Sequence, residues 1–162
     1  MILPDQFWGN YRLTFSVRCQ AEIKTFVTFT ESGGFNVKAF SEALQQHASK
    51  GKLVVILNFP NNPTGYLYSH DELLALRELV IKHDLFLFSD EVYREFCYDG
   101  LEHTSLMHME GIDDRAIMLD SISKRYSACG ARVGTIVTKN KDVINSALKF
   151  GMARLCPTTL EQ

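Results

Sequence analysis

The sequence predicts an α/β protein in which a mostly parallel sheet lies between two layers of helices. Strand-like apolar runs alternate along the chain with helix-like amphipathic segments, a pattern typical of strand–helix–strand units. Residues 53–57 (LVVIL) are apolar at every position, as expected for a strand covered on both faces. The chain has 162 residues, 46% hydrophobic and 22% charged, which is enough for one domain with a hydrophobic core.

Strands are expected where short runs of β-branched, aromatic or other apolar residues are bounded by turn-forming residues. The N-terminal Ile-Leu-Pro, at residues 2–4, has the composition of the end of a buried strand. The other expected strands cover residues 23–30, 53–57, 85–88, 116–119 and 133–138.

Helices are expected where apolar residues recur at three- and four-residue spacing. Asn36 is a suitable N-cap for a helix over residues 36–48. Ser69 and Glu72 form a capping-box pattern at the start of a helix over residues 69–83. Further helices are expected over residues 11–21 and 143–152. The last residues, 155–162, are expected to precede the start of another helix.

Composition and charge argue against several classes of protein. The formal net charge is −2, so there is no electrostatic case for binding nucleic acid or an acidic membrane surface. The N-terminus lacks the charged and apolar regions of a secretion signal, and the longest apolar run is too short to cross a bilayer. The cysteines are scattered without metal-ligand spacing, which favours free thiols in a reducing compartment, and we expect a cytoplasmic location; they are Cys19, Cys97, Cys129 and Cys156.

Unusual polar residues follow three of the expected strands. In open α/β sheets, ligands bind outside the carboxyl ends of the strands. Residues 58–65 (NFPNNPTG) taken alone predict an ordinary Asn/Pro/Gly turn. Asp90 and Glu91, in residues 89–93 (SDEVY), suit a metal site or a helix N-cap equally well. Residues 120–134 suit either an anion cradle or a solvated basic loop.

The order and combination of these loops are more specific than any one of them. Asn-Asn-Pro-Thr-Gly is followed by Asp-x-x-Tyr and then by Ser-x-Ser-Lys, with an arginine eight residues beyond the lysine. This arrangement resembles the class I and II aminotransferases, enzymes of fold-type I that depend on pyridoxal 5'-phosphate. Residues 121–134 fit the family's lysine-attachment signature, and residues 4–11 (PDQFWGNY) are similar to its segment that leads into the cofactor pocket.

The resemblance implies a catalytic role for three residues. Lys124 would bond covalently to the cofactor aldehyde and then move a proton at the substrate Cα, which requires a lowered amine pKa, favoured by partial desolvation and nearby cations. Asp90 would pair with the pyridine nitrogen and keep it protonated. Tyr93, together with Asn62, would bond the phenolic oxygen of the cofactor.

Other residues would hold the cofactor without reacting. Ser121, Ser123 and Arg132 resemble the family's phosphate ligands, and the arginine fork suits two phosphate oxygens. Trp8 matches an aromatic residue that packs on the cofactor ring, although a core tryptophan fits the sequence nearly as well.

Three kinds of conspicuous residue receive no catalytic role. Glu91 should point away from the side that Asp90 faces, because it is the next residue along the chain. The five histidines are expected at the surface or in packing positions. Arg125 either tunes the neighbouring lysine or is simply exposed.

The resemblance also implies that residues 1–162 are a partial large domain, truncated at both ends. The family has a glycine-rich phosphate loop upstream of Trp8 and a C-terminal small domain whose arginine binds the substrate carboxylate, and we find neither here. Intact members form homodimers with shared active sites. We therefore expect this piece to be inactive or severely impaired alone.

Several functions remain open at this point. The implied reaction is transamination between an amino acid and a 2-oxo acid, without nucleic acid, membrane or metal. A lyase or decarboxylase that depends on the same cofactor has the same fold. Aminotransferase-like domains also serve as ligand-sensing, non-catalytic parts of transcription regulators, and a folded scaffold without cofactor is a further alternative.

Overall fold

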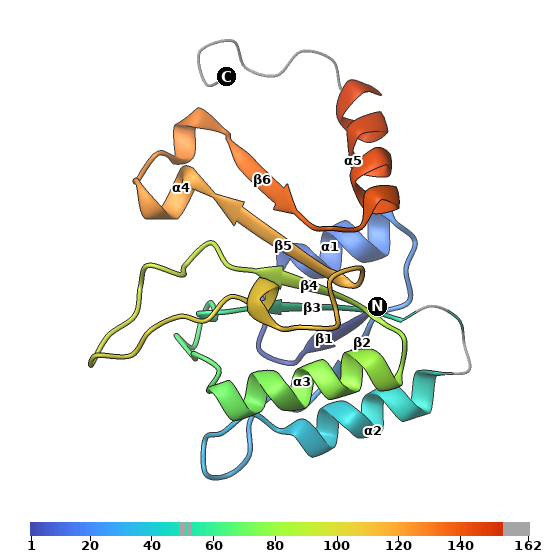
Figure 1. The fold of residues 1–162 in the computed structure, drawn as a ribbon, viewed down its shortest axis with the longest axis vertical. Coiled ribbons are helices and arrows are strands. Elements are labelled where there is room, and N and C mark those ends of the chain that lie inside the picture. Colours follow the sequence, from blue (N-terminus) through green and yellow to red (C-terminus); the bar gives the residue numbers. More distant parts are fainter. Residues whose placement is uncertain (49–50, 52, 154–162) are drawn as a thin grey trace.

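A computed structural model describes residues 1–48, 51 and 53–153 and contains a six-stranded sheet with helices on both faces (Figure 1). The strands are β1 (Ile2–Pro4), β2 (Lys24–Phe26), β3 (Val54–Asn58), β4 (Phe86–Asp90), β5 (Ala116–Ser121) and β6 (Gly134–Val137). Their order is β2-β1-β3-β4-β5-β6, and every pairing is parallel except that between β5 and β6. The predicted three-layer, mostly parallel α/β fold is confirmed.

Four of the five α-helices in the described residues overlap segments where the sequence predicts a helix, and the short helix at residues 122–125 was not predicted. The five helices are α1 (Asn10–Leu13), α2 (Val37–His47), α3 (His70–Lys82), α4 (Ile122–Arg125) and α5 (Lys141–Ala153). Asn36 caps α2 by accepting a hydrogen bond from the backbone N–H of Ala39. Ser69 and Glu72 form the predicted capping box at the start of α3.

Two hydrophobic clusters hold the layers together. The larger lies between the sheet and the pair α2 and α3, which run side by side along one face (Figure 1). The smaller lies on the opposite face, where Tyr11 of α1 packs against Leu3 and Ile56 of the sheet. Adjacent residues such as Val55 and Ile56 enter different clusters because successive side chains of a strand point to opposite faces.

Two elements are shorter than expected. The strand over residues 23–30 is limited to β2, because after Phe26 the backbone N–H of Thr28 donates to the Asp5 carboxylate instead of continuing the ladder. The helix over residues 11–21 consists of α1 and a π-helical turn, η1 (Thr14–Arg18), which ends at Cys19. The expected helix start at residues 155–162, and Cys156, lie outside the described residues.

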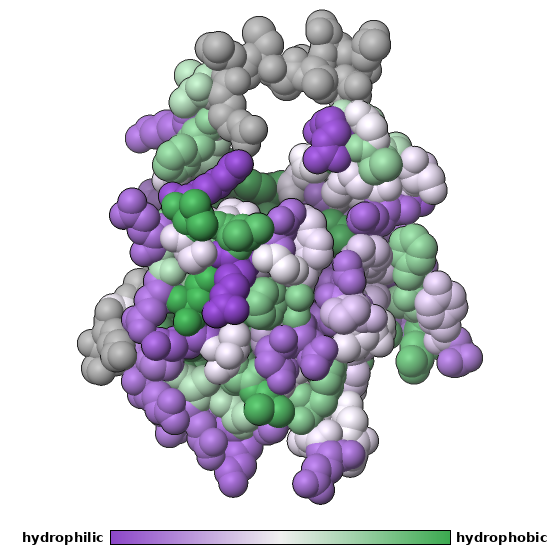
Figure 2. Space-filling model, turned by 180° about the vertical axis from the view of Figure 1, so that it is seen from behind, coloured by the Kyte–Doolittle hydropathy of each residue, from purple (hydrophilic) through white to green (hydrophobic). Residues whose placement is uncertain are grey.

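The surface carries large apolar side chains among polar ones. Leu13 at the end of α1 and Val17 in η1 are exposed, and Leu148, Phe150 and Met152 are exposed on α5. Figure 2 shows the rear face as apolar patches separated by hydrophilic groups. Within the described residues, no helix is both long enough and apolar enough to span a membrane.

Candidate active site

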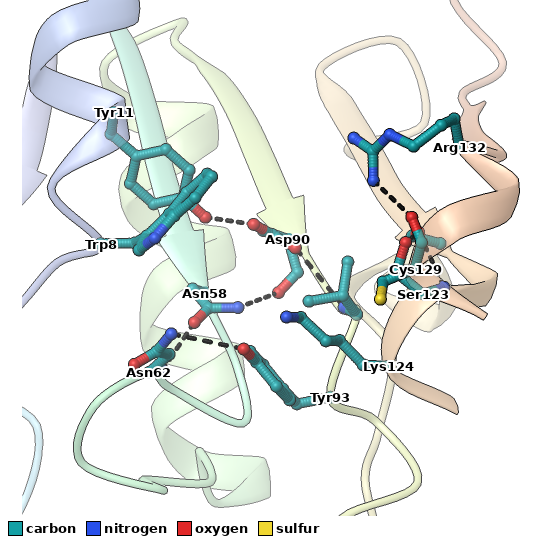
Figure 3. A pocket seen from close by; sticks show the side chains of 12 residues that line it. Trp8, Tyr11, Asn58, Asn62, Asp90, Tyr93, Ser123, Lys124, Cys129 and Arg132 are labelled. Atoms are coloured by element: carbon teal, nitrogen blue, oxygen red, sulfur yellow. Dashed lines mark hydrogen bonds between the residues drawn. The ribbon is translucent and has the colours of Figure 1, made fainter. Parts of the chain in front are cut away.

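The three polar loops meet at one edge of the sheet. They follow β3, β4 and β5, which are neighbours, and the register places Asn58 beside Asp90 and Asp90 beside Leu119. Between the loops lies a cavity of about 320 Å³ (Figure 3). Its lining contains all eight residues that the sequence singled out, together with Asn58, Val92, Cys129 and Tyr11; the eight are Trp8, Asn62, Asp90, Tyr93, Ser121, Ser123, Lys124 and Arg132.

Asp90 ends β4 with its carboxylate facing the cavity. The Tyr11 hydroxyl donates to Oδ2, and the backbone N–H of Val92 donates to Oδ1 over 3.4 Å. Burial raises the pKa of Asp90, and the negative charges of Asp120 and Glu91 add to this, while the hydrogen bonds from Tyr11 and Val92 act in the opposite direction. The carboxylate therefore has donors but a shortage of positive charge around it.

Tyr11 is a site residue that the sequence did not single out. Its ring meets Trp8 edge to face at 5.7 Å between centroids, and it belongs to the smaller hydrophobic cluster. Burial, and then the Asp90 charge, raise the pKa of Tyr11, so its phenol stays a hydrogen-bond donor. The available signal was its place in residues 4–11, the segment that resembles the one leading into the cofactor pocket.

Asn62 and Tyr93 are joined directly, since the Asn62 side-chain amide donates to the Tyr93 hydroxyl over 3.3 Å. Asn58 supports this pair: its side chain accepts from the Asn62 N–H at 2.7 Å and donates to the Asp90 carbonyl at 2.8 Å. The neighbouring Asn61 has other partners, since its side-chain oxygen accepts from Thr64 and its amide donates to the Gln6 carbonyl at 3.3 Å. Asn58 was missed because it reads as an ordinary strand end.

Lys124 lies on α4, a single helical turn capped by Ser121. The Ser121 hydroxyl accepts from the Ser123 N–H at 3.0 Å, and the two hydroxyl oxygens are 2.8 Å apart. The Lys124 amine is 5.9 Å from the centre of the Tyr93 ring. The partial desolvation expected of this lysine is not found, because its side chain is exposed. The short helix leaves it at the surface of the cavity.

Arg132 follows the turn η4 (Cys129–Ala131) and faces the cavity opposite Trp8, Tyr11 and Asp90 (Figure 3). Its backbone lies in the left-handed region at φ 58°, and its Nη1 donates to the Cys129 carbonyl at 2.7 Å. This contact folds the guanidinium back over its own loop. Cations and hydroxyls thus line one side of the cavity, and a carboxylate lines the other.

Arg125 does not extend into solvent. Its guanidinium bonds the Asp120 carboxylate at 2.8 Å and lies 3.4 Å from that of Glu95. These ion pairs tie α4 to the end of β5 and to the segment after β4. Arg125 therefore fixes the turn on which Lys124 lies.

The metal alternative finds no support in the described part of the chain. No group of three or more histidine, cysteine or acidic side chains converges there. Asp90 and Glu91 point to different sides, as expected, since Glu91 is fully buried among Ser89, His103 and Ser105. In the same part of the chain Cys19, Cys97 and Cys129 are thiols.

Comparisons with known proteins identify the family of the chain. The family model described as "Aminotransferase class I and II" matches residues 1–162. An asparagine–oxo-acid transaminase of Streptococcus mutans is 32% identical over 138 residues, which cover 85% of this chain and 34% of that protein. The chain therefore belongs to the class I and II aminotransferase family.

Solved structures share the fold over nearly the whole chain. Aspartate aminotransferase of Thermus thermophilus, solved with maleate, superposes with a TM-score of 0.85 at 26% identity and covers 99% of this chain. Cystalysin of Treponema denticola, which contains pyridoxal 5'-phosphate, superposes with a TM-score of 0.83 at 25% identity and also covers 99%. The chain spans only 40% and 41% of those two chains.

Proposed function

We propose that this chain forms most of the cofactor site of an aminotransferase that uses pyridoxal 5'-phosphate to exchange the amino group of an amino acid with a 2-oxo acid. One observation carries the proposal: a lysine, a carboxylate, an Asn–Tyr pair and an arginine from three separate loops line a single cavity. The proposal rests further on membership of the family and on the named activities of the relatives.

The residues of the cavity fit each functional group of the cofactor. Asp90 suits the pyridine nitrogen, because a buried carboxylate short of positive charge is stabilised by a protonated ring nitrogen. Lys124 is the primary amine among the lining residues and suits the aldehyde carbon. Asn62 and Tyr93 bring an amide and a hydroxyl, 3.3 Å apart, to the cavity wall, and these donors suit the phenolic oxygen.

The phosphate would lie at the opposite side of the cavity. Ser121 and Ser123 place two hydroxyls 2.8 Å apart, and Arg132 supplies a guanidinium from the same loop. Arginine binds two oxygens of one phosphate at once. Trp8, half exposed at the cavity wall, would cover a face of the ring.

The bound cofactor would supply an electron sink for a carbanion at the substrate Cα. Asp90 would hold the proton at the pyridine nitrogen, and Tyr11 would orient Asp90. Lys124 would accept the proton from the substrate Cα and then donate a proton to the former aldehyde carbon of the cofactor. The exposed position of its amine leaves it free to swing between these two points.

We propose in addition that residues 1–162 are part of the large domain of a longer, cytoplasmic, homodimeric protein. Family membership and the share of the relatives that the chain spans support this. The chain alone should then turn over slowly or not at all, because poor orientation of the substrate removes several kcal/mol of catalysis. Steady transamination by this chain alone, at rates typical of enzymes, would refute this part of the proposal.

The reaction itself is tested on the longer protein that carries this chain. It would be supplied with pyridoxal 5'-phosphate, an amino acid and a 2-oxo acid, and both organic products would be quantified. Formation of the new amino acid in equal amount to the new oxo acid supports transamination. Release of ammonia, pyruvate or CO₂ without the new amino acid contradicts it and favours a lyase or decarboxylase.

A further inference from the structure

The side chain of Glu91 is the centre of a buried polar cluster that lies outside the cavity. It is fully buried, and Oε1 accepts hydrogen bonds from three donors, the hydroxyls of Ser89 (2.6 Å) and Ser105 (3.0 Å) and the N–H of Leu106 (3.2 Å). The other oxygen, Oε2, lies 2.8 Å from Nε2 of His103. Burial of a carboxylate costs free energy unless its oxygens are hydrogen-bonded, so these bonds stabilise the buried Glu91 side chain.

The hydrogen bonds keep this carboxylate charged. Burial acts to raise the pKa of Glu91, but the bonds from His103, Ser89 and Ser105 outweigh it and hold the pKa below its usual value. An ionised carboxylate only accepts, so Nε2 of His103 must carry the hydrogen. Its other nitrogen, Nδ1, is buried and makes no hydrogen bond within the described residues.

The cluster is adjacent to Asp90 and Tyr93, which line the cavity from this loop together with Val92. Glu91 follows Asp90 directly, and its carbonyl accepts from the N–H of Arg94 at 3.0 Å, which closes the turn that carries Tyr93. The ring of His103 also lies 5.3 Å from that of Phe59, whose N–H donates to the Asp90 carbonyl. The cluster thus contacts the loops after both β3 and β4.

We propose that Glu91 is a positioning residue, which anchors the turn after β4 to the segment at residues 103–106 and so fixes the directions of Asp90 and Tyr93. The proposal rests on the proposed function only where it concerns the cofactor. Its alternative is that the β-ladder alone holds the turn, since the Glu91 N–H donates to the Leu119 carbonyl at 2.9 Å.

The main test compares Glu91→Gln with Glu72→Gln. Glu72 also accepts four hydrogen bonds, from Phe35, Tyr66 and twice from Ser69, but it lies at the start of α3 and outside the cavity lining. Gln at position 91 keeps the shape, yet its amide hydrogens require His103 to move its hydrogen to the unpartnered Nδ1. Both changes remove one carboxylate charge and perturb four hydrogen bonds, so Glu72→Gln controls for the loss of charge, although Glu72 is partly exposed and Glu91 is fully buried.

Two measurements show whether the turn that carries Tyr93 keeps its conformation. One is the hydrogen exchange of the Arg94 amide in the chain without cofactor, which follows opening of the turn. The other is the Kd for pyridoxal 5'-phosphate. We expect Glu91→Gln to accelerate the exchange about tenfold and weaken the affinity about tenfold, and Glu72→Gln to leave both within about twofold of the parent.

A second pair of variants guards against misfolding of Glu91→Gln. His103→Ala removes the donor to Oε2, whereas His103→Gln returns an N–H near the position of Nε2. The same exchange and affinity changes in His103→Ala, with recovery in His103→Gln, support the proposal. The proposal is overturned if Arg94 exchange in Glu91→Gln and His103→Ala changes no more than in Glu72→Gln. Should the parent chain bind no cofactor, the proposal that this chain forms most of the cofactor site fails, and the exchange comparison still decides the role of Glu91.

Discussion

The hydrogen bond from Tyr11 to Asp90 leads to a quantitative prediction, because Tyr11→Phe removes one oxygen and leaves the packing of the ring. Tyr11 is 8% exposed and packs with Leu3, Ile56 and the edge of Trp8, contacts that phenylalanine retains. A hydrogen bond to a charged group contributes about 1.5–3 kcal/mol. We expect Tyr11→Phe to lower the free energy of unfolding by about 2 kcal/mol at pH 7.

Urea unfolding gives the measurement. Trp8 is the only tryptophan of the chain and touches Tyr11, so its fluorescence reports unfolding near the site. Thermal unfolding gives a second measurement: in a chain of this length, a loss of 1 kcal/mol lowers Tm by about 2–4 °C, so Tyr11→Phe should lower it by about 4–8 °C. Tyr98→Phe serves as the control, since Tyr98 is 70% exposed and the loss of its hydroxyl should change the free energy of unfolding by less than about 0.5 kcal/mol.

A double-mutant cycle with Asp90→Asn assigns the effect to the pair. If Tyr11 acts through Asp90, the two losses will not add, and the coupling energy will be about 1 kcal/mol or more. A loss in Tyr11→Phe no larger than in Tyr98→Phe, or losses that add fully, would refute the reasoning.

The remaining predictions concern the acids of the site and the arginine. The pKa of Asp90 is raised in the folded state, so its contribution to stability is greatest below pH 3.8 and is lost as the pH rises through the folded pKa. Asp90→Asn should flatten this part of a plot of unfolding free energy against pH. Glu91 has the opposite sign, because its folded pKa lies below 4.5; its stabilisation is present above pH 4.5 and is lost as pH falls through the folded pKa, a loss that Glu91→Gln should abolish in the same plot. Equal slopes in parent and variants would contradict both assignments. Arg132→Lys keeps the charge but not the fork, and should weaken binding of pyridoxal 5'-phosphate about tenfold in a fluorescence titration of Trp8; unchanged affinity would remove Arg132 from the phosphate site.

The sequence best predicted features that depend on residues close together in the chain or on the general geometry of parallel sheets. The capping box of Ser69 and Glu72 predicted the start of α3, because both partners lie within one helical turn. The loops after β3, β4 and β5 were predicted to meet because parallel strands present their carboxyl ends at one edge of a sheet. Their residues then had to share one cavity, and they do.

What the sequence did not reveal depends on contacts between distant residues. Tyr11 and Asp90 are 79 residues apart, and Glu91 and His103 are 12 apart without any periodic pattern that joins them. The early end of β2 has the same origin, since the Asp5 carboxylate competes with the ladder for the N–H of Thr28. Such pairs are decided by how elements pack, and local propensity does not encode this.

The most direct test of the account is to locate the bond between the chain and its cofactor. The purified chain would be mixed with pyridoxal 5'-phosphate, reduced with borohydride, digested and mapped by mass spectrometry. Lys124→Ala would be compared with Lys139→Ala, which removes an exposed lysine paired with Asp113. We predict a visible absorbance band that borohydride bleaches, with the label on Lys124, retained in Lys139→Ala and absent from Lys124→Ala. A label spread over other lysines, or a band unchanged in Lys124→Ala, would contradict the assignment of the site.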